Sequence, residues 1–252
     1  MSGITHILVV NPNTTRSMTE TIADAANRVK NSTTEIRAVT SSMGPVSIEG
    51  YYDEAFAVPG LLVELAKGER EGAHAAVIAC FDDTGLDAAR ALAGIPVIGI
   101  CEAAISAASF IAQRFTVVTT MERSRQPLEH LVRRYGMAER CNVRAADIPV
   151  LSLEDPTSNA KMRLREEIAM ALAEDRAEAI VLGCAGMADL VAALRAEFGV
   201  PVIDGVAAAV KQAEMLVALG LTTAKRGAYA RPVSKPYHGM LEPFAPDSLL
   251  TR

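Results

Sequence analysis

The sequence predicts an α/β fold made of two similar open parallel-sheet domains, related by pseudo-twofold symmetry, with the active site in the cleft between them. Three observations support this prediction. Short β-branched runs alternate with helical stretches rich in Ala, Leu and Glu, as in right-handed βαβ units. Several of these runs are apolar at consecutive positions, which is typical of parallel strands buried on both faces. The same landmarks recur in the two halves of the chain.

The expected elements follow from these patterns. We expect strands over His6–Val10, Glu35–Thr40, Ala75–Ala79, Val97–Ile100, Phe115–Thr119, Cys141–Ala145, Ala179–Leu182 and Pro201–Ile203. We expect helices over Ser17–Lys30, Glu54–Glu69, Gly85–Leu92, Ala103–Gln113, Arg125–Tyr135, Ala160–Glu174, Met187–Glu197 and Val206–Leu219. The proline-rich segment 231–237 is expected to be irregular and could pack on a neighbouring subunit.

Two cysteines occupy matching places in the two halves. Cys80 ends the run Ala-Ala-Val-Ile-Ala-Cys, and Cys184 ends Ala-Ile-Val-Leu-Gly-Cys. Each half opens with an apolar strand before its cysteine and continues to a Pro-Val-Ile strand after it, which favours a duplication over chance recurrence of βαβ pieces. Ligands of open α/β sheets bind beyond the carboxyl ends of the strands, so both thiols are expected at one mouth.

Composition excludes several classes of function. The 252 residues are 50% hydrophobic and 22% charged, as in an ordinary globular protein. A net charge of −5 without clustered Lys or Arg argues against nucleic acid as a partner. Apolar runs too short to span a bilayer, and an N-terminus unlike a signal peptide, predict no membrane partner and a cytoplasmic location. The lack of GxGxxG, P-loop, CxxC and HExxH patterns disfavours dinucleotides, nucleoside triphosphates and a zinc site.

The paired thiols suggest acid/base chemistry. A thiol has a pKa of about 8.5, which falls at a helix N-terminus, and both cysteines precede expected helices. We therefore expect both to be poised near neutral pH, where opposed groups can take a proton from one face of a carbon and return one to the other. The small residues Gly183, Ala185 and Gly186 let backbone N–H groups approach a ligand and stabilise an enolate oxygen.

Other strand ends carry weaker candidates. Asn13 follows the first strand and can donate to and accept from an amide-like ligand. Thr119 and Thr120 end the strand opposite; they could contact ligand hydroxyls or simply terminate the strand. The adjacent Asp82 and Asp83 could bind a metal, but neighbouring carboxylates point in different directions, which favours loop or capping roles.

Five segments together resemble the hydantoin racemase family of the aspartate/glutamate racemase superfamily. They are 11–15, 47–55, 80–83, 117–120 and 183–187. The resemblance implies a cofactor-independent racemase that holds no metal, in which Cys80 and Cys184 exchange protons with C5 of a 5-monosubstituted hydantoin. It also implies that residues 1–100 plus 207–252 form one domain and residues 101–206 the other.

The resemblance further implies which residues contact the ring. Backbone amides around Ile48, Phe81, Asp82, Ala185 and Gly186 would bind it, and the side chains of Asn13, Thr119 and Thr120 would add contacts.

The chain departs from the amino-acid racemase branch after each cysteine. That branch has Cys-Asn-Thr and Cys-Thr-His, whereas here Phe81-Asp82 and Ala185-Gly186 follow. The loss of polar groups argues for a neutral or weakly acidic ring, a small-molecule substrate, over a free amino acid. Allantoin, a 5-ureidohydantoin, is the main alternative substrate. A superfamily isomerase or lyase and a non-catalytic bilobal binding protein are further alternatives. We also expect a homo-oligomer.

Overall fold

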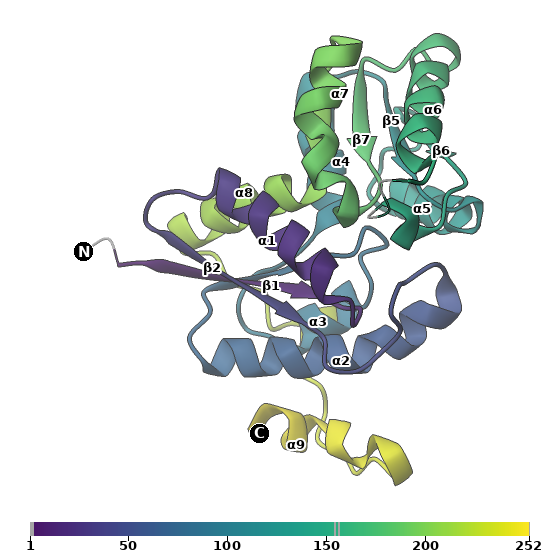
Figure 1. Ribbon diagram of the computed structural model, residues 1–252. Helices are drawn as coiled ribbons and strands as arrows, with labels where there is room; N and C mark the ends of the chain where they lie inside the picture. Colours follow the sequence, from purple (N-terminus) through teal and green to yellow (C-terminus); the bar gives the residue numbers. More distant parts are fainter. Residues whose placement is uncertain (1–2, 154, 156, 252) are drawn as a thin grey trace.

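Two four-stranded parallel sheets, one above the other in Figure 1, organise the part of the chain described by the computed structural model, residues 3–153, 155 and 157–251. The first sheet has the order β2-β1-β3-β4 and the second the order β6-β5-β7-β8. The orders coincide when four is subtracted from each label of the second, as the predicted duplication requires. The strands are β1 (Thr5–Asn11), β2 (Thr34–Thr40), β3 (Ala75–Ile78), β4 (Val97–Gly99), β5 (Phe115–Thr119), β6 (Cys141–Ala145), β7 (Ala179–Leu182) and β8 (Val202–Asp204).

The burial of several strands follows their sequence patterns. Every residue of β3, β5 and β7 is buried, which explains their unbroken apolar runs. The edge strand β6 alternates instead, because Cys141 and Val143 are buried while Asn142 between them is exposed. The predicted α/β fold with parallel sheets is confirmed.

The helices flank both sheets. They are α1 (Arg16–Val29), α2 (Tyr51–Arg70), α3 (Leu86–Leu92), α4 (Ile100–Ile111), α5 (Glu122–Arg134), α6 (Ala160–Glu174), α7 (Val191–Phe198), α8 (Gly205–Ala218) and α9 (Pro246–Thr251), with short 3₁₀ turns η1 (Val150–Leu153), η2 (Ala185–Leu190), η3 (Gly227–Tyr229) and η4 (Gly239–Phe244). Among these described helices, none is long and apolar enough to cross a membrane.

Several boundaries differ from the predicted ones, and the start of α4 differs for a physical reason. The strand predicted to end at Ile100 ends at Gly99, and α4 begins at Ile100 instead of Ala103. The carboxylate of Asp83, distant in sequence, accepts hydrogen bonds from the first turn of α4 and so starts the helix early. The helix predicted from Met187 begins as the 3₁₀ turn η2 and becomes α-helical at Val191.

Helices α4 and α8 join the two lobes. Each follows the last strand of its sheet, and the two pack together where the sheets meet (Figure 1). A Cβ at Gly205 would lie 2.7 Å from the Ile100 carbonyl oxygen, so glycine permits this close approach. One core cluster runs through both sheets, with Val9 and Val77 from the first and Val117 from the second. The two lobes therefore share a continuous hydrophobic cluster.

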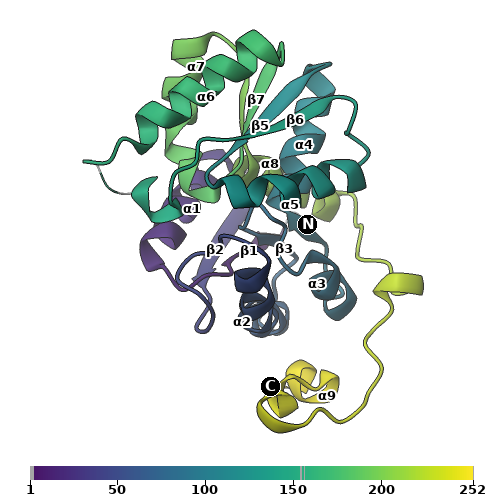
Figure 2. The same cartoon turned by 90° about the vertical axis from the view of Figure 1, so that its right-hand side faces the viewer.

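The C-terminal tail lies along the first lobe. Thr223 contacts the segment before β4, since its backbone N–H donates to the Gly94 carbonyl (3.1 Å) and its hydroxyl to that of Ile95 (2.6 Å). Beyond it the chain descends to α9, beneath α2 (Figure 2). Segment 231–237 is irregular, as predicted, whereas η4 and α9 were not predicted. The domain boundaries 1–100 plus 207–252 and 101–206 stay a prediction.

Candidate functional site

A small cavity of about 40 Å³ lies where the carboxyl ends of β1, β3, β5 and β7 converge. Its lining joins both lobes and contains both cysteines that the repeat singled out. The lining residues are Asn13, Met18, Ile48, Ala79, Cys80, Phe81, Asp82, Thr119, Thr120, Ser124, Val150, Gly183, Cys184 and Ala185. The structure thus brings together every predicted site residue except Gly186, which adjoins the cavity with its Cβ position 3.7 Å from the Cys184 sulfur.

Four lining residues were not predicted. Met18 and Ser124 lie in the first turns of α1 and α5, the helices that follow β1 and β5. The strand-end rule could have identified both, because a helix that leaves a strand end starts at the same edge of the sheet. Ala79 belongs to the run before Cys80, and Val150 belongs to η1, for which the local sequence carries no signal.

Each thiol sits in a loop two residues beyond a central strand. Cys80 follows β3, and its sulfur accepts a hydrogen bond from the Thr84 hydroxyl at 3.3 Å and another from the backbone N–H of Asp82. Cys184 follows β7 and accepts from the backbone N–H of Gly186. Because β3 and β7 are the matching strands of the two sheets, the thiols occupy equivalent positions on the two sides of the cavity.

The prediction that both thiols are poised near neutral pH is wrong, because both thiol pKa values are raised. Burial raises the pKa of Cys184 to about 11, although the Gly186 N–H lowers it. Burial, and then the Asp82 carboxyl, raise the pKa of Cys80 well above its ordinary value, although Thr84 opposes this. Both cysteines are half-buried, and this partial shielding from water disfavours the thiolate more than the short helices beyond the loops favour it.

Carboxyl groups surround the thiols. Burial, Glu54 and Asp83 raise the pKa of Asp82 to about 8, so its side chain is mostly neutral at pH 7. Burial also raises the pKa of Glu54, whose Oε1 atom is buried with no hydrogen-bond partner among the described residues. Sequence reasoning gave Glu54 no part in the site, because only the fold brings the start of α2 to the Cys80 loop.

Asn13 has one donor free for a ligand. Its Oδ1 accepts from Asn11 Nδ2 (2.9 Å) and from the Thr15 backbone N–H (2.9 Å), which fixes the amide orientation. Its Nδ2 contacts the Met18 sulfur at 3.5 Å, and a thioether is a weak acceptor. The Asn13 amide therefore presents one N–H at the cavity wall.

The β5 end packs tightly against the Cys184 loop. The Thr119 hydroxyl donates to the Gly183 carbonyl at 3.1 Å, so it is already satisfied within the protein. A Cβ at Gly183 would lie 2.9 Å from both Cα and Cβ of Thr119. Of the two roles predicted for Thr119, this geometry favours the structural one. Gly183 is a glycine because β5 and β7 leave no space for a side chain.

The segment before α2 crosses from the first lobe to the second beside the cavity. The Glu49 carboxylate accepts from the Val150 backbone N–H at 3.4 Å, and the Tyr51 hydroxyl contacts His130 Nδ1 at 3.3 Å. Ile48, in the same segment, lines the cavity. The segment closes one side of the site with contacts to η1 and α5.

Comparisons with known proteins agree with this geometry. Residues 7–213 match the family described as Asp/Glu/Hydantoin racemase. The chain is 51% identical to a hydantoin racemase of Rhizobium meliloti, with 93% of this chain and 98% of that protein covered. It is 49% identical to a hydantoin racemase of Pseudomonas sp. (strain NS671), with coverages of 98% and 99%.

Solved structures give the same result. The fold superposes on an allantoin racemase from Klebsiella pneumoniae with a TM-score of 0.93 and 48% identity, covering 96% of this chain and 99% of that one. The two kinds of relative carry names for different substrates, and both are named as racemases.

Proposed function

Because the chain belongs to the Asp/Glu/hydantoin racemase family and is an isomerase, we propose that it racemises 5-monosubstituted hydantoins by proton transfer between C5 and two cysteines, without a cofactor. The observation that carries the proposal is the shared cavity: Cys80 and Cys184 reach it from matching strand ends on opposite lobes. A two-base reaction needs this arrangement, since the proton leaves one face of the carbon and another arrives on the opposite face.

The proposed reaction balances without an added reagent. One thiolate takes the C5 proton, the C5–H bond electrons move into the C4 carbonyl, and an enolate forms. The opposite S–H group then gives its proton to the other face of C5 and becomes the thiolate. After one turnover the two sulfurs have exchanged protonation states, so each cysteine acts as base for one enantiomer.

The composition of the cavity wall supports a neutral ring. No Lys, Arg or His is among the described residues that line it, whereas Asp82 lines it and Glu54 lies close by. A free amino-acid carboxylate would be buried beside carboxyl groups without a cationic partner, which is unfavourable. The Asn13 amide offers a donor to a ring carbonyl or to the enolate oxygen.

Among hydantoins we favour general activity on alkyl and aryl substituents, with allantoin as the second candidate. Relatives named hydantoin racemase support the first, and the allantoin racemase structure supports the second. The cytoplasmic location and homo-oligomeric assembly stay predictions.

Polarimetry on pure enantiomers tests the proposal. Allantoin, 5-benzylhydantoin and 5-alkylhydantoins are incubated side by side with the protein at equal concentration. We expect loss of rotation for the alkyl and aryl compounds at least as fast as for allantoin. A wide preference for allantoin would move the assignment to the second candidate, and no loss with any ring would refute the proposed function.

A further inference from the structure

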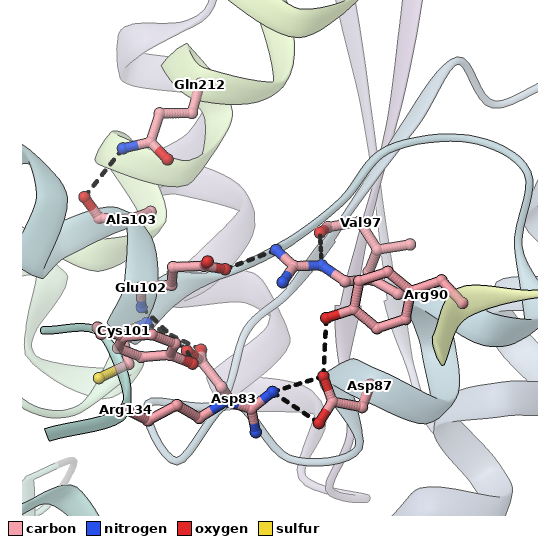
Figure 3. Close-up of polar contacts among 11 residues, drawn as sticks. Asp83, Asp87, Arg90, Val97, Cys101, Glu102, Ala103, Arg134 and Gln212 are labelled. Carbon is pink, nitrogen blue, oxygen red and sulfur yellow. Dashed lines mark hydrogen bonds and ion pairs between the residues drawn. The ribbon is translucent and has the colours of Figure 1, made fainter. Parts of the chain in front are cut away.

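The loop that carries Cys80 is hydrogen-bonded to α4, which leads into the second sheet, and to the end of α5, which follows β5. The carboxylate of Asp83 accepts from the backbone N–H groups of Cys101 and Glu102, at 2.9 Å each, in the first turn of α4 (Figure 3). It also accepts from the hydroxyl of Tyr135, at the end of α5, at 2.6 Å. A buried side chain three residues beyond a reacting thiol thus makes three hydrogen bonds to two helices outside its own loop.

The backbone at Asp83 is held in an uncommon conformation. Its φ of 47° is in the left-handed region, which residues with a Cβ seldom adopt and which Asp and Asn tolerate best. Its N–H donates to the Cys80 carbonyl at 3.0 Å, and its own carbonyl accepts from Leu86 at 3.0 Å. The same residue therefore closes the turn from Cys80 into α3 and reaches across to α4 and α5.

The second half of the chain solves the equivalent problem differently. In the repeat, Gly99 at the end of β4 corresponds to Asp204 at the end of β8. Asp204 caps α8 locally, accepting from the N–H groups of Val206 and Ala207 at 3.0 Å each. At Gly99 a Cβ would lie 2.2 Å from an Asp83 carboxylate oxygen, so the carboxylate fills the space of the missing side chain.

A local aspartate at position 99 would have capped α4 equally well, as the second half demonstrates. Placing the carboxylate in the Cys80 loop instead adds a connection that capping alone does not need. We propose that Asp83, supported by Tyr135, is a positioning residue that holds Cys80 in place against Cys184 across the cavity. The proposal rests on the proposed two-cysteine reaction.

A displaced Cys80 would change deuterium exchange for one enantiomer and not for the other. The two enantiomers have equal free energy, so kcat/KM for racemisation must fall equally in both directions. When Cys184 removes the proton, however, a misplaced Cys80 delivers its proton slowly, and the enolate is more often reprotonated from the side of Cys184. In heavy water, deuterium then enters that recovered enantiomer without inversion. The other enantiomer also racemises more slowly, but its exchange without inversion does not rise.

Two variants separate positioning from capping. Tyr135→Phe removes the hydrogen bond from Tyr135 to Asp83 and leaves the two hydrogen bonds by which Asp83 caps α4. The double variant Asp83→Gly/Gly99→Asp moves the cap to its local position, as at Asp204, and removes the connection to the Cys80 loop. Asp87→Asn is the matched control, because Asp87 makes a solvent-exposed pair with Arg134 (2.6 Å) between α3 and α5 (Figure 3).

We expect Tyr135→Phe and the double variant to racemise about 10- to 100-fold more slowly, the range for a displaced reacting group. Exchange without inversion should rise for one enantiomer only, the same one as in Cys80→Ser. The double variant should recover the thermal stability that Asp83→Gly alone loses, without recovering racemisation. Full racemisation by the double variant, or equal exchange into both enantiomers, would overturn the proposal.

A second measurement needs no substrate. Iodoacetamide labelling of the ligand-free protein, followed by peptide mass spectrometry, should show faster alkylation of Cys80 in both variants, an unchanged rate at Cys184, and wild-type rates in Asp87→Asn. Unchanged alkylation of Cys80 would refute the proposal that Asp83 and Tyr135 position Cys80. If the wild-type protein racemises no hydantoin, the proposed function fails. The alkylation rates alone then show whether Asp83 and Tyr135 hold Cys80 in place.

Discussion

Replacing Asp82 with asparagine should change the pH dependence of racemisation more than its rate at low pH. Asp82 is nearly isosteric with asparagine and lines the cavity beside both thiols, where its charge raises their pKa values. Its own pKa is about 8. About one molecule in a hundred carries that charge at about pH 6, and about nine in ten at about pH 9.

The size of the effect follows from these values. The pKa of Cys184 is about 11, with burial the larger cause and Asp82 a smaller one. A nearby like charge contributes about one pKa unit, so its loss should raise the thiolate fraction about tenfold wherever Asp82 is ionised. We expect kcat/KM of Asp82→Asn to match the wild type at about pH 6 and to exceed it by about tenfold at about pH 9.

Polarimetry with one pure hydantoin enantiomer, repeated across this pH range, measures the ratio. Asp87→Asn makes the same change of charge on the exposed face of α3 and should give a ratio near one throughout. A constant loss of activity in Asp82→Asn at every pH would refute the reasoning, because the carboxyl would then act in the reaction itself.

Three further predictions concern the same loops. Thr84→Val removes the hydroxyl that donates to Cys80 at 3.3 Å, and polarimetry should show racemisation slowed about 10- to 100-fold in both directions, the range for a hydrogen bond to a charged group. Burial raises the pKa of Asp82 to about 8 and that of Asp83 to about 7, so the folded state holds protons that the unfolded state releases. Stability is therefore full below about pH 4 and should fall by several kcal/mol as the pH rises to about 8, measured by urea unfolding at fixed pH; a flat profile would contradict the burial argument. Gly183→Ala places a Cβ 2.9 Å from β5 and should cost about 1–3 kcal/mol in the same assay, whereas wild-type stability would mean that the strands can separate.

The fold was predictable because its signals are local. Buried parallel strands such as β5 and β7 are unbroken apolar runs, and their predicted bounds match the structure. The repeated cysteines identified the edge of each sheet where the site lies. The start of α4 was missed because its cap comes from Asp83, which is close in space and distant in sequence. The sequence favoured a loop or capping role for Asp82 and Asp83, but it could not show which helix would be capped.

The electrostatics of the site could not be predicted from the sequence. A position before a helix suggested lowered thiol pKa values, but the outcome depends on how completely the fold excludes water from Cys80 and Cys184. Glu54 and Val150 also join the site only through the tertiary arrangement of α2 and η1. Residues that follow strands were predictable, whereas residues brought in by packing were not.

Heavy-water exchange with the single variants Cys80→Ser and Cys184→Ser shows whether the two thiols act on one carbon from opposite faces. Each enantiomer is incubated separately, and both C5 deuterium and optical rotation are followed. We predict that both variants lose racemisation, and that any deuterium exchange that remains is confined to one enantiomer, a different one for each variant. Full racemisation by either variant would contradict the two-base account.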